Sequence, residues 1–402
     1  MRDLRKKSTI KQAFILCGGL GSRLGKITKK TPKPLILFNK KPFIEYLINQ
    51  LARHNIKEIF LLCGYKKELF FQKYHNKLVL NSKVTCIAET KPLGSAGAIY
   101  KVRNYLDKNF FLLNGDTFYE INFNDFAKKY LSSKKLLGIV TLKKKGSRFL
   151  NIHKKKGKYI FEKNKNNIIN SGILCLNKKI IKTLNNKSFS LEEEIFKKLA
   201  IKNQIYTYDE SIKNTKFFDI GTPDSLVKAK IEIPKLEKKK TIFLDRDGVI
   251  NEDLGYVVRK NKFKWIKNIQ KLIKYFNNNN YYTIVVTNQS GIGRGFYSEK
   301  DVKHLHKWAN FQLNLYGAHI DDFYYAPYFS KSKNLKYRKN FFLRKPKIGM
   351  IIEAAKKWNI DLKKSIVIGD QLSDIEMAKK LKLKYFLVDK KTNYIKFIKD
   401  QI

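Results

Sequence analysis

Cysteine is scarce in this sequence. Its 402 residues include only four cysteines, Cys17, Cys63, Cys86 and Cys175, and all of them lie in apolar, strand-like runs of the first half. Their spacing matches neither a disulfide framework nor a zinc site. The pattern argues against a disulfide-stapled secreted protein and favours a reducing compartment.

Long apolar runs are also missing. No stretch approaches the roughly 20 apolar residues that a membrane-spanning helix needs, so we expect no membrane partner. The basic start MRDLRKKSTIKQ is followed by AFILC, which is shorter than the roughly 7 to 15 apolar residues of a signal-peptide core. We therefore expect a cytoplasmic location.

Acidic residues are few. The sequence has 34 Asp and Glu but 84 Lys and Arg, which gives a formal net charge of +50. Such a charge suits nucleic acid, an anionic surface or small phosphorylated substrates. However, the lysines are spread through every segment beside abundant Asn and Ile, which is typical of a biased coding composition, and no nucleic-acid-reading motif is present. We expect small-molecule substrates and no specific nucleic-acid partner, while the oligomeric state stays open.

The length and the apolar pattern predict two α/β domains. A chain of 402 residues exceeds one compact core. Short apolar runs such as AFILC and EIFLLC alternate with amphipathic stretches such as FIEYLINQLARH, which predicts mainly parallel sheets with helices on both faces. The alternation lapses at IEIPKLEKKKT and begins again at TIFLD. We predict domains at 1–232 and 241–402, joined by a linker at 233–240.

The segment QAFILCGGLGSRLG predicts a strand that runs into a glycine-rich loop. It lacks the Gly-Lys-Ser/Thr of a P-loop, and Leu24 stands where the dinucleotide fingerprint has its third glycine. Backbone N–H groups of the loop could still close on a polyphosphate, although an ordinary tight turn has the same pattern. Downstream, TPKPL holds a lysine between two prolines. The candidate phosphate-binding residues are Gly18, Gly19, Gly21, Ser22, Arg23 and Lys33.

Seven motifs in order, GGLGSRL, PKPL, ETKPLGSAGAI, LLNGDTF, FEK, NSGI and FFDIGTPDSL, resemble those of the sugar-1-phosphate nucleotidylyltransferases over residues 11 to about 230. The resemblance implies a Rossmann-like nucleotidyltransferase domain in which Asp116 and Asp219 hold Mg²⁺. It assigns the sugar phosphate to Lys163, Asn170 and Gly172. It assigns the nucleotide to the loop glycines and to Glu89, Pro92, Leu93, Gly94 and Gly97.

The residues alone leave structural alternatives open. Asp116 could belong to a turn, Asp219 to a helix cap and Asn170 to a loop that satisfies its own backbone. In the implied reaction, a sugar 1-phosphate oxygen attacks the α-phosphorus in line and pyrophosphate leaves. Such a site needs alignment and charge neutralisation more than proton transfer. Mg²⁺ on the two aspartates, with Arg23 and Lys33, would supply both.

The second half opens on LDRDGVIN, which places two aspartates either side of an arginine at the end of a predicted strand. VVTNQSG, RKPKIGM and IGDQLSD follow, and together these motifs resemble the haloacid-dehalogenase phosphatases. The resemblance implies that Asp245 is the nucleophile and Asp247 the general acid. It also implies phosphate contacts from Thr287, Asn288, Arg344 and Lys345, and Mg²⁺ bound by Asp245, Asp247 and Asp370.

Strand geometry constrains this second site. Alternation along an extended strand would send Asp245 and Asp247 to opposite sides, so the strand must end at Asp245 and turn. The candidate residues lie where apolar strands finish, the side of an open α/β sheet on which ligands bind. An ordinary surface lysine is the alternative for Lys345, which its RKP context disfavours. Asp374 is expected to orient the site or to cap a helix.

Within that superfamily, DRDGVINEDLGYV, TNQSGIGRG and RKPKIGM resemble the heptose 1,7-bisphosphate 7-phosphatases most, over residues 241 to about 390. Histidinol-phosphate phosphatases share much of this pattern. Members commonly carry a zinc loop of cysteines and a histidine before RKP, but here YYAPYFSKSKNLKYRKNFFLRKP contains neither residue type. Gln371 also stands where a lysine is frequent. We therefore expect Mg²⁺ in both domains and no zinc.

Two phosphate-handling domains on one chain suggest consecutive steps. The phosphatase would remove the 7-phosphate of a heptose 1,7-bisphosphate, and the transferase would activate the resulting 1-phosphate. The first resemblance implies the α-anomer and GTP, and hence GDP-D-glycero-α-D-manno-heptose for surface polysaccharide. Two alternatives stay open: a hexose-1-phosphate nucleotidylyltransferase fused to a phosphatase of other specificity, such as histidinol phosphate, and a basic binding or scaffold protein with inactive sites. The retained carboxylates argue against the second.

Overall fold

The computed structural model describes residues 9–144, 151–155, 158–162, 167–183, 190–209, 216–338, 341–389 and 391–401. The chain divides into two compact units, Met1–Lys235 and Leu236–Ile402. The segment predicted as a linker is partly helical, because helix α7 (Pro223–Glu232) is followed by a short 3-10 helix at Pro234–Glu237. Among the described residues, no helix combines the length and the apolar character needed to cross a membrane.

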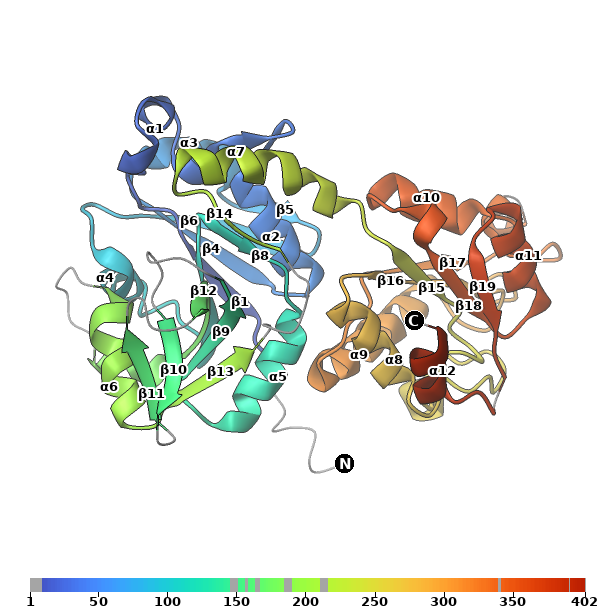
Figure 1. The fold of residues 1–402 in the computed structure, drawn as a ribbon. Coiled ribbons are helices and arrows are strands. Elements are labelled where there is room, and N and C mark those ends of the chain that lie inside the picture. Colours follow the sequence, from blue (N-terminus) through green and yellow to red (C-terminus); the bar gives the residue numbers. More distant parts are fainter. Residues whose placement is uncertain are drawn as a thin grey trace. The chain divides into compact units, whose positions relative to one another are not determined.

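The first unit is built on a ten-stranded sheet (Figure 1). Its strands are β1 (Gln12–Leu16), β4 (Glu58–Cys63), β5 (Lys77–Val79), β6 (Ser82–Ala88), β7 (Asn109–Asn114), β9 (Leu137–Lys143), β10 (Asn151–Lys155), β11 (Lys158–Glu162), β12 (Ile168–Asn177) and β13 (Ile205–Asp209). The order β7-β1-β4-β6 is parallel and forms the centre. Antiparallel pairs extend it on both sides, through β5 at one edge and β12, β10 and β11 at the other. β9 pairs with β12 and with β13.

Smaller elements complete this unit. Two strand pairs lie outside the main sheet, β2 (Leu37–Phe38) with β3 (Lys41–Pro42), and β8 (Thr117–Tyr119) with β14 (Phe217–Asp219). The helices besides α7 are α1 (Lys26–Lys30), α2 (Phe43–Arg53), α3 (Lys67–Tyr74), α4 (Gly94–Lys101), α5 (Phe123–Ser133) and α6 (Lys197–Ile201), with a π-helical turn, η5 (Leu191–Phe196), before α6.

Apolar strands buried on both faces explain why helices cover both sides of this sheet. On one face, the ring of Phe14 in β1 stacks on Phe60 in β4 with 4.9 Å between centroids, and the buried residues of α4 join the same cluster. On the other face, Phe111 of β7 packs edge-on against Phe123 of α5 at 5.1 Å. Continuous apolar runs of this kind are typical of parallel strands between helix layers. The predicted α/β class is confirmed, with the antiparallel strands as an addition.

The second unit contains a fully parallel sheet in the order β17-β16-β15-β18-β19. Its strands are β15 (Thr241–Leu244), β16 (Tyr282–Asn288), β17 (Asp322–Ala326), β18 (Ile366–Gly369) and β19 (Lys384–Leu387). Its helices are α8 (Ile269–Asn278), α9 (Glu299–Tyr316), α10 (Gly349–Lys357), α11 (Leu372–Lys380) and α12 (Tyr394–Gln401). Helix α9 begins at a capping box between Ser298 and Asp301 and ends at Gly317, which has a φ of 88°.

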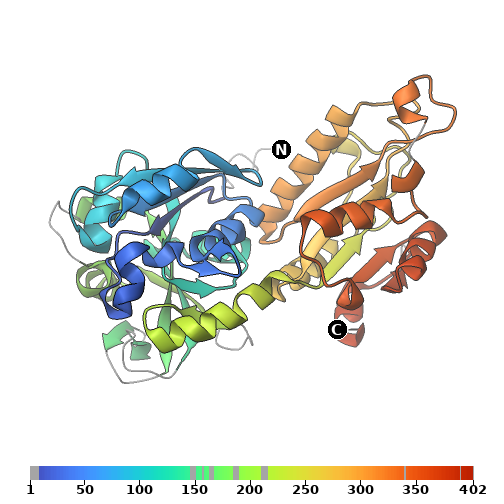
Figure 2. The same cartoon turned by 90° about the horizontal axis from the view of Figure 1, so that it is seen from above.

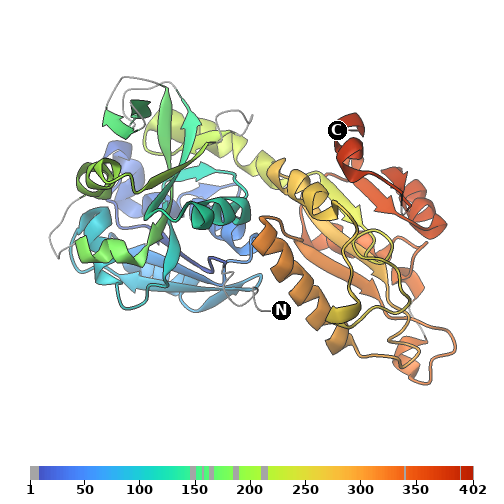
Figure 3. The same cartoon turned by 90° about the horizontal axis from the view of Figure 1, so that it is seen from below.

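Alternation along β15 divides the core of this unit in two. Ile242 and Leu244 face one cluster, which includes buried residues of α8, α9 and α12. Phe243 faces the other, with buried residues of α10 and α11. Seen from above, α10 lies in front of the strands (Figure 2), and seen from below, α8 and α9 do (Figure 3). The helices thus occupy both faces, and the strand ends stay open for a site.

Candidate active sites

In the second unit, three neighbouring strands end beside one cavity. Asp245 follows β15, Thr287 and Asn288 end β16, and Asp370 follows β18. Because β16, β15 and β18 are parallel neighbours, their carboxyl ends meet at one edge of the sheet. A cavity of about 360 Å³ lies there. Its lining includes Asp245, Asp247, Thr287, Asn288, Gln289, Tyr297, Lys345, Asp370 and Gln371.

Lys345 joins two buried carboxylates in this cavity. Its Nζ lies 2.8 Å from Oδ2 of Asp245 and 2.6 Å from Oδ1 of Asp374. Burial raises the pKa of Asp245 to about 6, although the Lys345 charge opposes the rise. Burial also acts to lower the pKa of Lys345, but the two carboxylates outweigh it and the pKa is raised. Lys345 is therefore a buried cation beside Asp245, the predicted nucleophile, unlike an ordinary surface lysine.

The carboxylate of Asp370 is arranged to receive a cation. Its Oδ1 is buried and without a hydrogen-bond partner, while Oδ2 accepts from Nε2 of Gln371 at 3.0 Å. Burial raises the pKa of Asp370. Gly248 has a φ of 83°, and a Cβ there would lie 2.0 Å from Oδ2 of Asp370. Only glycine allows this approach, so the DRDG motif makes room for Asp370.

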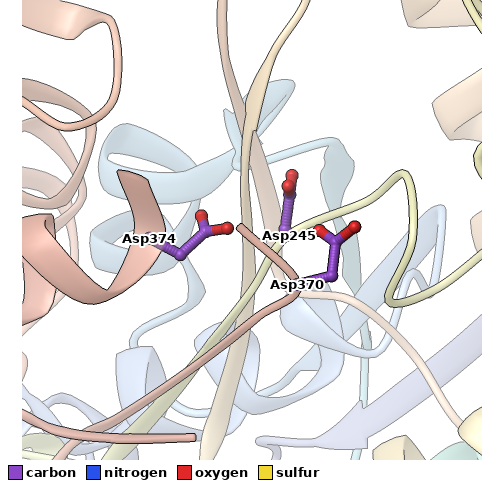
Figure 4. A group of neighbouring side chains, drawn as sticks. All are labelled: Asp245, Asp370 and Asp374. Carbon is purple, nitrogen blue, oxygen red and sulfur yellow. The ribbon is translucent and has the colours of Figure 1, made fainter. Parts of the chain in front are cut away.

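Asp245, Asp370 and Asp374 each offer an oxygen within 4.8 Å of the others, and they form the one group of three metal-ligating side chains found in the described part of the chain. Figure 4 shows the Asp374 carboxylate pointing from its helix toward Asp245. Both Asp374 oxygens have partners, because Oδ2 accepts from the backbone N–H of Gln371 at 3.2 Å. Both Asp245 oxygens have partners as well, because Oδ1 accepts from the Arg246 N–H at 2.7 Å and Oδ2 contacts Nζ of Lys345. Oδ1 of Asp370 is therefore the carboxylate oxygen of this group that is left without a partner.

Asp247 reaches the same cavity but is held differently. β15 ends at Leu244, one residue before the expected end, and the chain then turns. This turn brings Asp247 to the cavity that Asp245 also lines. Both Asp247 oxygens accept hydrogen bonds from side chains of Arg246, Asn251 and Gln289. Asp247 was predicted as a metal ligand as well as an acid, but its carboxylate is not in the three-carboxylate group.

The remaining phosphatase candidates lie around Lys345. Asn288 fixes the position of the Lys345 backbone, because its Oδ1 accepts a hydrogen bond from the Lys345 N–H at 3.1 Å. Nη1 of Arg344 donates to the carbonyl of Tyr328 at 3.2 Å, and Arg344 is half-buried outside the cavity lining. Burial lowers the pKa of Arg344, and the nearby charge of Arg294 adds to this effect. Arg344 therefore lies within electrostatic range of Arg294.

The segment between β17 and α10, which lacks the cysteines and histidine of a zinc loop, is held by hydrogen bonds to the carboxylate of Glu299. Glu299, at the start of α9, accepts from the hydroxyls of Tyr325 and Tyr337 at 2.8 and 2.9 Å and from Nζ of Lys336 at 2.7 Å. The hydrogen bond from Lys336 is the main cause that lowers the pKa of Glu299 to about 2. These three donors connect the segment and the end of β17 to the start of α9.

In the first unit, a second cavity of about 550 Å³ lies at the ends of parallel strands. The loop after β1, Glu89 after β6, and Gly115 and Asp116 after β7 meet there. The predicted residues in its lining are Gly18, Gly19, Gly21, Ser22, Lys33, Glu89, Pro92, Leu93, Gly94 and Asp116. Arg23 is exposed and Gly97 is buried inside α4, and neither is in the lining.

Close packing fixes the shape of this nucleotide-sized cavity. A Cβ on Gly18 would lie 2.6 Å from Oε2 of Glu89, and Gly21 has a φ of 68°. Burial raises the pKa of Glu89. Helix α4 begins at Gly94 on the cavity wall, so its N-terminal end, where backbone N–H groups are unpaired, borders the cavity. The wall thus offers backbone donors and a carboxylate acceptor.

The two predicted metal ligands of this unit are brought together by strand pairing. Asp219 ends β14, which pairs with β8 so that Asp219 lies opposite Thr117. The Ile220 N–H donates to the carbonyl of Asp116 at 3.0 Å, which joins the two segments. Oδ2 of Asp116 is 2.9 Å from Nζ of Lys33, and Oδ1 of Asp219 accepts from the Gly221 N–H at 2.6 Å. Asp219 itself is outside the cavity lining.

One of the predicted sugar-phosphate residues, Gly172, lies next to this cavity wall. Gly172 has a φ of 80°, and a Cβ there would lie 2.7 Å from Nδ2 of Asn114, which lines the cavity. Asn170 is buried and donates from Nδ2 to Oε1 of Glu192 at 2.6 Å. Glu192, from the SLEEEIF segment, is a neighbour that the motifs did not single out. Lys163 lies outside the described residues.

Comparison with known proteins agrees with this division. Residues 12–235 match the family model described as nucleotidyl transferase, and residues 342–393 match the HAD-hydrolase-like model. A D-glycero-alpha-D-manno-heptose 1-phosphate guanylyltransferase of Campylobacter jejuni is 34% identical over 222 residues, which cover 53% of this chain and 96% of the relative. A D-glycero-beta-D-manno-heptose-1,7-bisphosphate 7-phosphatase of Rhodopseudomonas palustris is 43% identical over 142 residues, 35% of this chain and 79% of the relative.

A solved structure also resembles the first unit. The crystal structure of HddC from Yersinia pseudotuberculosis is 28% identical, with a TM-score of 0.47, and the match covers 56% of this chain and 100% of that chain. The family matches and the two relatives, each covered over most of its length, establish the family of both units. The chain belongs to the nucleotidyl transferase family through its first unit and to the HAD-hydrolase-like phosphatases through its second, so that one polypeptide unites a nucleotidyltransferase with a phosphatase.

Proposed function

We propose that the second unit removes the 7-phosphate of D-glycero-α-D-manno-heptose 1,7-bisphosphate and that the first unit transfers GMP from GTP to the resulting heptose 1-phosphate. The products are phosphate, pyrophosphate and a GDP-heptose. The observation that carries this proposal is the pair of cavities at strand ends, about 550 Å³ in the first unit and 360 Å³ in the second, together with relatives named for a heptose 1-phosphate guanylyltransferase and a heptose 1,7-bisphosphate 7-phosphatase.

The anomer follows from the order of the steps. The relative of the first unit is named for the α-anomer, and the relative of the second unit described above is named for the β-anomer. Other relatives of the second unit are named for the α-anomer. Removal of the 7-phosphate leaves the anomeric carbon untouched. Two consecutive activities on one chain therefore require the same anomer, and the transferase relative favours α.

The phosphatase reaction begins with attack on phosphorus by Asp245. One Asp245 oxygen forms a bond to phosphorus while the bond to the sugar oxygen breaks, and Asp247 gives its proton to that oxygen. Water then attacks the phosphorus of the aspartyl phosphate, and Asp247 takes a proton from that water. The bond between Asp245 and phosphorus breaks, which releases phosphate and regenerates the Asp245 carboxylate. Lys345 stabilises the charge that develops on the phosphoryl oxygens. A Mg²⁺ ion held by Asp245 and Asp370 would add further charge neutralisation.

The transferase reaction needs little proton transfer. The cavity wall positions GTP through the loop of Gly18 to Ser22 and the first turn of α4. Lys33 faces the position where phosphate charge develops, and Asp116 and Asp219 would hold Mg²⁺ there. The sugar phosphate enters from the side of Asn170 and aligns its oxygen with the α-phosphorus.

The bisphosphate specificity has its own support in the second unit. Arg294 and Tyr256 both act electrostatically on Arg344, and Tyr256 lines the phosphatase cavity, although the two arginines do not. Guanidinium groups beside the cavity would suit a second phosphate on the substrate. A substrate with a single phosphate and a cationic group, such as histidinol phosphate, would gain nothing from them.

The experiment is an assay of the purified full-length protein with the α and β heptose 1,7-bisphosphates and each of the four nucleoside triphosphates. We expect phosphate release from the α-bisphosphate and nucleotide sugar only when GTP is present. Nucleotide sugar formation with a hexose 1-phosphate but not with the heptose 1-phosphate would overturn the heptose assignment. Phosphate release from the β-anomer alone would overturn the consecutive order.

A further inference from the structure

Arg246 stands between the two proposed catalytic aspartates in sequence, yet it is among the largest fully buried side chains, with 1% of its surface exposed. A buried cation is costly unless it is paired and hydrogen-bonded. Nη2 of Arg246 donates to Oδ1 and Oδ2 of Asp247 at 2.9 and 2.8 Å, and Nε donates to Oδ1 at 3.2 Å. The Arg246 guanidinium therefore binds the Asp247 carboxylate through several N–H groups.

The far side of the guanidinium is fixed by the core. Nη2 also donates to the carbonyl of Val257 at 2.6 Å, and Nη1 lies 3.4 Å from Nε2 of His306. Burial, with a contribution from the Arg246 charge, lowers the pKa of His306 well below its usual range, so the ring is neutral and can accept this hydrogen bond. The ring stacks on Phe323 with 4.4 Å between centroids. Arg246 has little freedom to turn.

Two further donors complete the surroundings of Asp247. Nδ2 of Asn251 donates to Oδ1 at 2.9 Å, and Nε2 of Gln289 donates to Oδ2 at 2.9 Å. Gln289 is buried, and its Oε1 accepts from the hydroxyl of Tyr297 at 2.9 Å. The carboxylate is thus held by side chains from two separate segments of the chain, on the wall of the phosphatase cavity.

We propose that Arg246 is a positioning residue of the phosphatase, which, together with Gln289, holds the Asp247 carboxylate at the reacting phosphate through both proton transfers. This inference rests on the proposed phosphatase function. Arg246 acts through Asp247, because its donors are directed at Asp247, Val257 and His306, and it is not in the cavity lining.

The demand on Arg246 differs between the two half-reactions. In the first, Asp247 gives its proton to the sugar oxygen as the bond from that oxygen to phosphorus breaks and Asp245 becomes phosphorylated. Asp247 is then an anion that waits for water, and it takes the water proton as the bond between Asp245 and phosphorus breaks. A partly buried anion needs a paired cation and fixed donors. Loss of Arg246 should therefore impair hydrolysis of the aspartyl phosphate most.

An aryl phosphate separates the two half-reactions. The nitrophenolate of p-nitrophenyl phosphate leaves without a proton, so formation of the aspartyl phosphate does not need Asp247 as an acid. We expect the full-length Arg246→Gln variant, with Mg²⁺, to release the first nitrophenolate within about 3-fold of the wild-type rate and to turn over about 100-fold more slowly. The fraction of enzyme trapped in acid as aspartyl phosphate should rise, and Arg246→Lys should restore part of the turnover.

A double-mutant cycle tests whether the effect passes through Asp247. If it does, Arg246→Gln adds little to the loss caused by Asp247→Asn. Multiplication of the two losses, or an equal slowing of first release and turnover with no rise in trapped phosphoenzyme, would show that Arg246 serves only the fold and would overturn the proposal.

A second variant covers the case in which Arg246→Gln does not fold. Gln289→Met removes the other donor to Asp247 and keeps the side-chain length, and Tyr297→Phe, which removes only the hydroxyl that orients Gln289, is its matched control. We expect slower turnover with more trapped phosphoenzyme in Gln289→Met and a smaller change in Tyr297→Phe. Wild-type turnover in Gln289→Met would overturn the inference. By contrast, a wild-type protein that hydrolyses no phosphate ester would overturn the phosphatase function itself.

Discussion

Nζ of Lys33 lies 2.9 Å from Oδ2 of Asp116, so the cation that we propose for the nucleotide phosphates is paired with a predicted metal ligand. Lys33→Gln removes this cation from the cavity. We expect nucleotidyl transfer to fall by about 100-fold, because charge stabilisation is the main demand of the reaction, while phosphate release by the second unit is unchanged. Pyrophosphate release measures the first activity. Lys30→Gln, at an exposed neighbouring lysine, is the control and should behave as wild type.

Single carboxylate changes should separate the two activities. Asp245→Asn keeps the side-chain shape but removes the nucleophile's charge, so phosphate release should fall by several orders of magnitude while transfer to supplied heptose 1-phosphate continues. Asp116→Asn should do the reverse, and heptose 1-phosphate should accumulate from the bisphosphate. Both assays are run on each variant. If either folded variant loses both reactions, the two sites are not independent.

Gly248→Ala should damage the phosphatase alone. The added Cβ would lie 2.0 Å from Oδ2 of Asp370 at a φ of 83°, so Asp370 must move. A displacement of about 1 Å at a reacting group can cost about 100-fold in rate, and we expect a loss of this size in phosphate release. Gly295→Ala is the control, since its φ of 78° imposes strain but its Cβ would meet nothing within 4 Å. Equal losses in both variants would contradict the steric argument.

Glu299 should stabilise the second unit in a pH-dependent way. Its folded pKa is lowered from 4.5 to about 2, mainly by Lys336, so its contribution is present above about pH 4.5 and is lost as the pH falls toward 2. Glu299→Gln should lower the melting temperature of this unit at pH 6 by a few degrees, and the difference should shrink on acidification. Glu252→Gln, from an exposed pair 3.8 Å from Lys264, should have little effect. A difference that is constant with pH would contradict the assignment.

The phosphatase should work without zinc. The chain has no cysteine after Cys175 and no histidine after His319, which leaves no soft-ligand set for a structural zinc site in the segment before Arg344. Metal analysis of the purified protein should find no stoichiometric zinc, and Mg²⁺ alone should restore phosphate release after chelation. One zinc ion bound per chain would contradict this prediction.

Much of the fold could be predicted because its central strands are continuous apolar runs. β1, β4 and β7 of the first unit and β15, β16 and β18 of the second are buried on both faces, and this burial is visible in their composition. The antiparallel additions could not be predicted in the same way. β10 and β11, for example, pair antiparallel, but they carry several lysines and show no clear apolar alternation that would predict this pairing.

The candidate sites were predictable where a motif ends a strand, as at Asp245 and Asp370. The contacts between motifs were not. Nothing in the sequence indicated that Gln289 would donate to Asp247, or that Arg246 would face His306, which lies 60 residues along the chain. Such contacts depend on how α9 packs against the sheet, and this packing is settled by the whole core rather than by local spacing.

Because of the cysteine distribution, thiol labelling can report the unfolding of the first unit alone. All four thiols are free and buried in the first unit, and the second unit has none. Burial raises the pKa of Cys17, which lines the nucleotide cavity, so the folded thiol is a poor nucleophile. A maleimide dye added during unfolding therefore labels only the nucleotidyltransferase half. The unfolding of this half can be followed in the intact bifunctional chain, because the phosphatase half has no thiol that reacts with the dye.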